Sequence, residues 1–263
     1  MSDPLYYALC ATLFTCAMTA VGAAAVFLFR QQPKPLFTKL SLGFAAGIMV
    51  AASVWSLLIP AMESARAQDM LPLIPAAGGF ILGVLFLVCL DSLLPHLHFG
   101  ATAPEGPRIP LGRNTLLFLA ITIHNIPEGM AVGVACAVAA AGGGVDGTAG
   151  ALALAVGMGL QNIPEGAAVS LPLCAGGQSR QVAFLKGAFS GVVEPIAAAI
   201  TVIFAAEFTP LLPWLLSFAA GAMLYVVVEE LIPEAHLGEH SNGGTLCVLA
   251  GFLLMMILDT TLG

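Results

Sequence analysis

The sequence contains few charged residues. Asp, Glu, Lys and Arg make up 9% of its 263 residues, and hydrophobic residues make up 59%, whereas soluble domains contain about 25% charged residues. A soluble core cannot absorb that much apolar surface. An ordinary water-soluble fold is therefore excluded, and lipid is the expected solvent.

Two further absences narrow the function. The eight basic residues form no cluster, which excludes the electrostatic footprint of a nucleic-acid partner or of an anionic lipid headgroup. The six cysteines include no CxxC pair, which argues against a zinc knuckle or a redox pair. We interpret these cysteines as small buried hydrophobes.

Eight apolar stretches are long enough to cross a bilayer. A transmembrane helix needs about 20 residues for a hydrocarbon core of about 30 Å, and the connections between the stretches are short. We predict an all-α membrane protein with one transmembrane domain over residues 1–263. The expected spans are 5–29, 39–60, 73–95, 114–140, 147–173, 181–206, 210–233 and 244–262.

The basic residues predict the orientation. If the spans alternate in direction, Arg66 falls on one side and all other basic residues fall on the opposite side. Because Lys and Arg mark the cytoplasmic loops, we predict that both termini are extracytoplasmic. The residues assigned to the cytoplasmic side are Arg30, Lys34, Lys39, Arg108, Arg113, Arg180 and Lys186.

Spans two and seven look like copies. Residues 44–49 read FAAGIM and residues 218–223 read FAAGAM, and both spans end in Leu-Ile-Pro, at 58–60 and 231–233. The third and eighth spans agree as well, since a glycine precedes a Leu-Asp pair at the same spacing in both. Two matched pairs in the same order indicate an internal repeat.

The repeat predicts the architecture. Its copies lie five spans apart, an odd number, so the second copy is inverted relative to the first, an arrangement common in secondary transporters. Spans one to three then mirror spans six to eight. Spans four and five form a third unit, which completes a 3+2+3 plan.

A polar hexapeptide occurs in both central spans. Span four contains HNIPEG at 124–129, and span five contains QNIPEG at 161–166. His124 and Glu128 are four residues apart, and Asn125 and Glu128 are three apart, so all three project from one helix face. Span five repeats this pattern with Gln161, Asn162 and Glu165.

Proline accompanies each acid of these spans. Pro127 and Pro164 remove a backbone donor and free a carbonyl one turn earlier, which loosens the helix there. Glu194 on span six is followed by Pro195. The pattern therefore places three glutamates, Glu128, Glu165 and Glu194, near mid-span.

The three glutamates need a neutralising partner. A bare anion at mid-membrane costs roughly 2.5–3.5 kcal/mol even on the insertion scale. Every Lys and Arg falls in a loop or at a span end, which leaves protons or a bound cation. His124 favours a borderline divalent metal such as zinc, iron(II), cobalt or manganese, because calcium and magnesium sites are usually all oxygen.

Three alternatives remain open at this point. The acids could form a proton-capped network that only holds helices together. They could hold zinc in a membrane-embedded hydrolase, although the sequence contains no HExxH. They could also serve a proton-coupled carrier of organic solutes.

The two hexapeptides, the VVEP of span six and the eight-span plan resemble the ZIP (Zrt/Irt-like) metal transporter family, in its bacterial GufA-like branch. The resemblance covers the whole chain. It implies uptake of divalent metal into the cytoplasm across a bacterial inner membrane, with zinc as the leading substrate and cadmium as a surrogate. Iron(II) and manganese are further candidates, and no organic cofactor is expected.

The resemblance also implies a two-metal site at the midplane, bridged by Glu128 and Glu165. The transported ion would be held by Met49, His124, Glu128, Gln161 and Glu165. The second ion would be held by Asn125, Glu128, Asn162, Glu165 and Glu194. Spans one, four, five and six would move as a block against the others in an elevator-like step, and the chain could form a homodimer.

Other polar residues predict the two mouths of the path. We expect a cytoplasmic exit at Glu229, Glu230, His236, Glu239 and His240, which His96 and His98 could join. We expect an extracytoplasmic entrance at Ser56, Glu63 and Asp259, where negative charge would concentrate cations. Ordinary solvated loops and polar helix ends are the alternative interpretations of both groups.

Overall fold

The structure is a computed structural model that describes residues 4–28, 35–93, 113–207, 209–236 and 242–262. Within these ranges the chain forms helices joined by turns and contains no strand. The predicted all-α class is therefore confirmed for the described residues.

The helices follow the order of the eight expected spans. The first expected span is α1 (Pro4–Ala23) with α2 (Ala25–Leu28), and the second is α3 (Pro35–Ala52), η1 (Ser53–Leu58) and α4 (Ile59–Ala67). The next three are α5 (Leu73–Leu93), α6 (Arg113–Val138) with η2 (Ala139–Gly143), and α7 (Gly144–Ala175). The sixth expected span is α8 (Arg180–Ser190) with α9 (Val193–Glu207). The seventh is η3 (Thr209–Leu211), α10 (Leu212–Val226), η4 (Val227–Leu231) and α11 (Ile232–His236). The eighth is α12 (Asn242–Leu262).

Seven of these stretches are long and apolar enough to cross a membrane, as judged over the described residues. The fifth expected span, α7, is not among the seven, although its 32 residues give a helix about 48 Å long. The polar side chains of Gln161, Asn162 and Glu165 lower the hydropathy of α7. α7 is therefore long enough to cross the membrane, but its mean hydropathy is too low for it to count among the seven membrane-spanning stretches.

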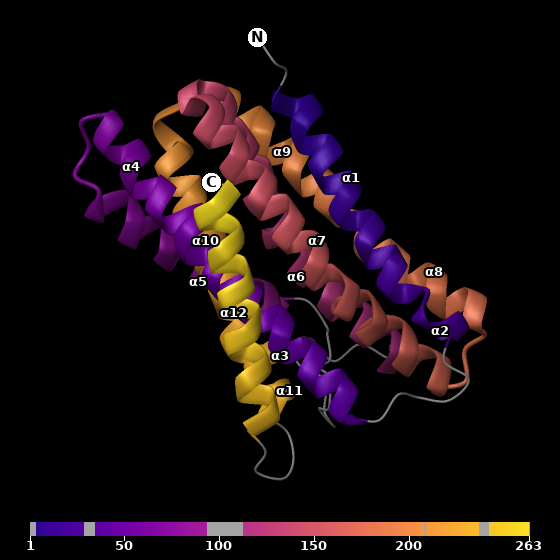
Figure 1. The fold of residues 1–263 in the computed structure, drawn as a ribbon. Coiled ribbons are helices and arrows are strands. Elements are labelled where there is room, and N and C mark those ends of the chain that lie inside the picture. The colour runs from indigo at the N-terminus through magenta and orange to yellow at the C-terminus, as the bar shows by residue number, and fades with distance from the viewer. Residues whose placement is uncertain (1–3, 29–34, 94–112, 208, 237–241, 263) are drawn as a thin grey trace.

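The helices form two groups. α1, α6, α7, α8 and α9 pack on one another, while α3 packs on α12 and α5 packs on α10. α7 lies against α3 and α12, and α6 lies against α10, so these contacts join the groups. Figure 1 shows α1, α6, α7 and α8 together on one side of the molecule, with α3, α4, α5, α10 and α12 on the other.

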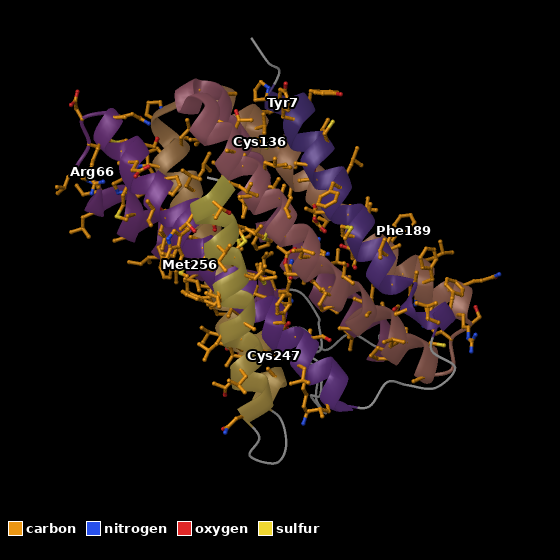
Figure 2. The ribbon with its side chains drawn as sticks, viewed as in Figure 1. Tyr7, Arg66, Cys136, Phe189, Cys247 and Met256 are labelled. Carbon is orange, nitrogen blue, oxygen red and sulfur yellow. The ribbon has the colours of Figure 1, made fainter. Side chains whose placement is uncertain are left out.

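Apolar side chains cover the outside of the molecule. Phe189 on α8 is 62% exposed and projects outward from its helix in Figure 2. α5 and α12 also carry many exposed leucines, isoleucines and valines. Such a surface suits lipid rather than water, which agrees with the solvent predicted from the composition.

Two π-helical segments interrupt the helices of the similar second and seventh spans. The Ile59 N–H donates to the Val54 carbonyl, and the Ile232 N–H donates to the Val227 carbonyl, in both cases across five residues. Each segment ends at the leucine before an Ile-Pro pair. Such segments are frequent at functional sites because they change which of the following side chains face the interior.

Glycines allow the close helix crossings of the second group. A Cβ atom at Gly251 on α12 would collide with the backbone of Phe44 and Ile48 on α3. A Cβ atom at Gly83 on α5 would collide with the backbone of Phe218 and Ala222 on α10. Close backbone approach at small residues is a common basis of helix packing in membranes.

The sixth expected span is broken between α8 and α9. Pro195 has no backbone N–H and is the third residue of α9, within the first turn, where backbone N–H groups have no partner inside the helix. The Glu194 N–H donates to the Gly191 carbonyl at 3.1 Å, although a continuous α-helix would direct it to Ser190. The break therefore leaves the Ser190 carbonyl available to another donor.

The α3–α12 crossing predicts a contrast between two helical glycines. Gly251→Ala should lower the melting temperature of the detergent-purified protein, because overpacking typically costs about 1–3 kcal/mol. Gly150→Ala on α7 is the matched control, since nothing lies within 4 Å of a Cβ at that position. It should keep or raise the melting temperature, because alanine is the better helix former. Equal melting temperatures for the two variants would contradict the crossing.

Candidate metal site

The polar face of α6 points into the protein. His124, Asn125 and Glu128 are 4%, 0% and 2% exposed. Gly129 lets α6 approach α9, because a Cβ there would collide with the backbone of Glu194. The first hexapeptide thus stands buried beside the first turn of α9.

The second hexapeptide faces the first. On α7, Gln161, Asn162 and Glu165 are all buried. The carboxyl groups of Glu128 and Glu165 lie close to one another, and the Gln161 side chain lies beside both. Two carboxyl groups this close cannot both be bare anions. They need a shared proton or a cation between them.

Two acceptors on α6 have no hydrogen-bond donor among the described residues. They are Asn125 Oδ1 and Glu128 Oε2, and both are buried. The Asn125 amide donates to the Ser190 carbonyl at 3.0 Å, which fixes its oxygen on the opposite side. An unsatisfied buried acceptor is costly, so a pair of them within one helical turn indicates a place for a cation.

Glu194 belongs to the same buried cluster. It is 1% exposed, and the Asn162 amide donates to its Oε1 at 2.9 Å. The Thr15 hydroxyl of α1 donates to its Oε2, and the Thr19 hydroxyl lies 3.4 Å from its Oε1. α1 therefore contributes directly to the site.

The sequence analysis missed the threonines of α1. Thr12, Thr15 and Thr19 recur at helical spacing within an apolar helix and are all fully buried. That hydroxyl stripe is the signal that could have indicated them, since residues three and four apart share a helix face.

His124 has a carboxylate partner. Its Nδ1 lies 2.9 Å from Oε2 of Glu230 on η4. We predicted Glu230 at the cytoplasmic exit, and the structure places its carboxylate against the first hexapeptide. A carboxylate on Nδ1 fixes the orientation of an imidazole and leaves Nε2 for a metal, as in many metal sites.

Met49 is buried on α3, in the main apolar core. Its helix packs against α7, which carries the second hexapeptide. No described polar contact joins its thioether to the site, so its role as a ligand stays a prediction of the resemblance.

The residues predicted at the entrance separate into two sets. The Ser56 hydroxyl on η1 donates to Oδ1 of Asp259 on α12 at 2.6 Å. Both residues are 8% exposed, and Asp259 Oδ2 has no hydrogen-bond donor among the described residues. Glu63 is exposed on α4 and does not join this pair.

Most residues predicted at the exit cannot be placed beside Glu230. Glu229 is exposed on η4, and His236 ends α11 with a side chain that is not described. Glu239, His240, His96 and His98 lie outside the described residues. The exit therefore remains a prediction apart from the position of Glu230.

The donor set of the cluster mixes acids with amides. No three His, Cys, Asp or Glu side chains within the described ranges are arranged to hold a metal ion by themselves. No Lys or Arg of the described ranges contacts Glu128, Glu165 or Glu194. A cation held here would need amide oxygens in addition to the carboxylates.

The fold and the buried polar cluster define a multi-pass helical membrane protein. The family model described as "ZIP Zinc transporter" matches residues 111–259. The chain is 36% identical to "Zinc transporter ZIP11" of Homo sapiens, over 98% of both chains. It is 38% identical to "Zinc transporter GufA" of Myxococcus xanthus, over 97% of this chain and 98% of the relative.

A third relative is "Zinc transporter ZIPB" of Bordetella bronchiseptica, at 40% identity over 94% of this chain and 76% of the relative. The chain therefore belongs to the ZIP family. The relatives include a bacterial branch with GufA, as the hexapeptides predicted. The family is one of transporters and not of enzymes, which removes the hydrolase alternative.

The His124–Glu230 contact predicts the effect of a neutral substitution. Glu230→Gln should weaken zinc binding by the purified protein by about 10- to 100-fold, the usual cost of losing the partner of a metal-ligating histidine. Asp69→Asn is the control, because Asp69 is an exposed acid outside every predicted site. Titration with a competing zinc dye measures both affinities. Equal affinities would show that Glu230 does not support His124.

Proposed function

We propose that the protein carries divalent transition metals, zinc foremost, across the membrane into the cytoplasm. The observation that carries this proposal is the pair of buried acceptors without donors, Asn125 Oδ1 and Glu128 Oε2, beside the Glu128–Glu165 contact. A divalent cation there would satisfy both oxygens and the paired acids together. Relatives named as zinc transporters support the same substrate.

The transported ion is held by Glu128, Glu165 and His124, with Gln161 and Met49 as the remaining ligands implied by the resemblance. Imidazole, carboxylate and amide donors suit several first-row ions, so iron(II) and manganese also bind, and cadmium serves as a surrogate. The Gln161 nitrogen now donates to Asn162 Oδ1, so Gln161 must turn its oxygen towards the two acids to act as a ligand.

The path continues from this site towards both faces of the membrane. Ser56 and Asp259 receive the ion on the extracytoplasmic side, where the second oxygen of Asp259 is open. Glu230, already in contact with His124, is the first acceptor towards the cytoplasm. The other predicted exit residues lie beyond it.

All eight helical stretches cross the membrane, including α7, in the 3+2+3 plan. The crossings at Gly83 and Gly251 support inverted repeats. The first joins α5 to Phe218 and Ala222, and the second joins α12 to the corresponding Phe44 and Ile48. The π-helical segments η1 and η4 occupy corresponding places as well.

The two helix groups support an elevator-like step. α1, α6, α7, α8 and α9 carry His124, Glu128, Glu165 and Glu194, and the other group carries Ser56 and Asp259. Movement of the first group against the second would carry the ion between the two faces. Both termini are extracytoplasmic, and α1 begins and α12 ends towards the same side in Figure 1.

Transport is tested with the purified protein in liposomes that contain a metal-sensitive dye. Zinc and cadmium added outside should enter at a rate set by the protein. Glu128→Ala and Glu165→Ala should reduce the rate at least about 10-fold, because each removes a bridging carboxylate. Asp69→Asn is the control for a general loss of charge, because Asp69 is an exposed acid outside every predicted site. The proposal is lost if zinc, cadmium, iron(II) and manganese all fail to enter.

The site also predicts a dependence on pH. Protons and metal compete for the Glu128 and Glu165 carboxylates and for the His124 imidazole, because each must be deprotonated to bind. Zinc affinity should therefore fall as the pH is lowered, and zinc binding should release protons into a weakly buffered solution. Calorimetry in two buffers of different ionisation enthalpy measures the release. Binding without proton release would contradict a carboxylate site.

A further inference from the structure

The contacts of Glu194 bear on the number of ions in the site. The resemblance makes Glu194 and Asn162 ligands of a second ion. In the structure both oxygens of Glu194 already accept hydrogen bonds, one from Thr15 and the other from Asn162. Thr15, Asn162 and Glu194 are each at most 1% exposed. A buried carboxyl group with a donor on each oxygen has its hydrogen-bonding needs met without a cation.

The orientation of Asn162 follows from its neighbours. The nitrogen of its side chain lies 2.9 Å from Glu194 Oε1 and 3.2 Å from the Thr15 carbonyl oxygen. Both neighbours are acceptors, so the group between them must be the amide NH2. The Asn162 oxygen in turn accepts from the Gln161 amide. Asn162 therefore presents hydrogens, and not its oxygen, to Glu194.

The position of α1 fixes these donors. A Cβ at Gly166 on α7 would collide with the Thr19 carbonyl, and a Cβ at Gly22 on α1 would collide with the Ile163 carbonyl. The two glycines hold α1 close to α7 within about one helical turn of Asn162. The close packing of α1 on α7 thus sets the position of the Thr15 hydroxyl beside Glu194.

We propose that in this protein Glu194 is held by hydrogen bonds from Thr15 and Asn162 instead of by a second metal ion, so that the site carries one ion at a time. Thr15 is a positioning residue, and Thr19 supports it from the next turn of α1. The single ion lies at Glu128 and Glu165, where the Asn125 oxygen is open to it. This inference rests on the proposed function.

The experiment counts the ions bound at saturation. Purified protein is dialysed to equilibrium against zinc, and the metal is measured by mass spectrometry. The metal bound by the Glu128→Ala, Glu165→Ala double variant is subtracted, which removes zinc held by loops. The parent should bind one ion per chain. Asn162→Asp should bind two, because it replaces the donor facing Glu194 with a second anion that needs a cation.

Substitutions on α1 separate a positioning role from a packing role. Thr15→Val keeps the shape but frees Glu194 Oε2, so a second ion should appear, and Thr15→Ser should return the count to one. Thr12→Val is the matched control, because Thr12 is equally buried and its hydroxyl donates at 2.7 Å to Ala8 of its own helix. It should bind one ion, as the parent does.

The outcomes are distinct. Two ions in the parent, or a Thr15→Val variant that matches Thr12→Val, would overturn the inference and leave metal transport standing. No ion above the double-variant baseline would overturn the proposed function itself. If Thr15→Val does not elute as a folded protein in size-exclusion chromatography, the parent and Asn162→Asp counts decide the question alone.

Discussion

The structure depends on carboxyl groups buried where no basic side chain of the described residues reaches them. Glu128 and Glu165 lie close together inside the helix bundle, and Glu194 lies near them. The membrane cannot solvate such a cluster, so the protein must supply donors or accept a cation. For Glu194 the donors come from α1 and α7. For the Glu128 and Glu165 pair, the open acceptors point to a cation from outside the chain.

Many of the buried polar contacts form where a regular α-helix is interrupted. The break after Ser190 frees a carbonyl that takes the Asn125 amide and so turns the Asn125 oxygen to the site. The π-helical segment η4 carries Glu230 to His124, and η1 carries Ser56 to Asp259. Prolines lie in or next to each of these places. In a bundle made mostly of apolar helices, these helix breaks and π-helical segments direct polar groups towards the protein interior without exposing the backbone to lipid.

Much of the site could be predicted from the sequence, because helical periodicity puts His124, Asn125 and Glu128 on one face whatever their neighbours are. The membrane class followed from composition, and the family followed from the repeated hexapeptide. The contact of Glu230 with His124 could not be predicted, because a π-helical turn changes which face of the helix the residues after it occupy. The role of Thr15 depends on a crossing between helices far apart in sequence, which periodicity within α1 cannot give. The acids and histidines of the loops follow no sustained helical spacing, so their positions relative to the site could not be predicted.

The central claim is that a divalent cation lies between the two paired glutamates. Anomalous diffraction from crystals of the protein grown with cadmium tests it most directly, because the peak locates the ion independently of any assumed ligand. The account predicts a strong peak within coordinating distance of carboxyl oxygens of both Glu128 and Glu165, on the Nε2 side of His124. Peaks confined to loops or to the outer surface, with no peak near the two glutamates, would contradict it.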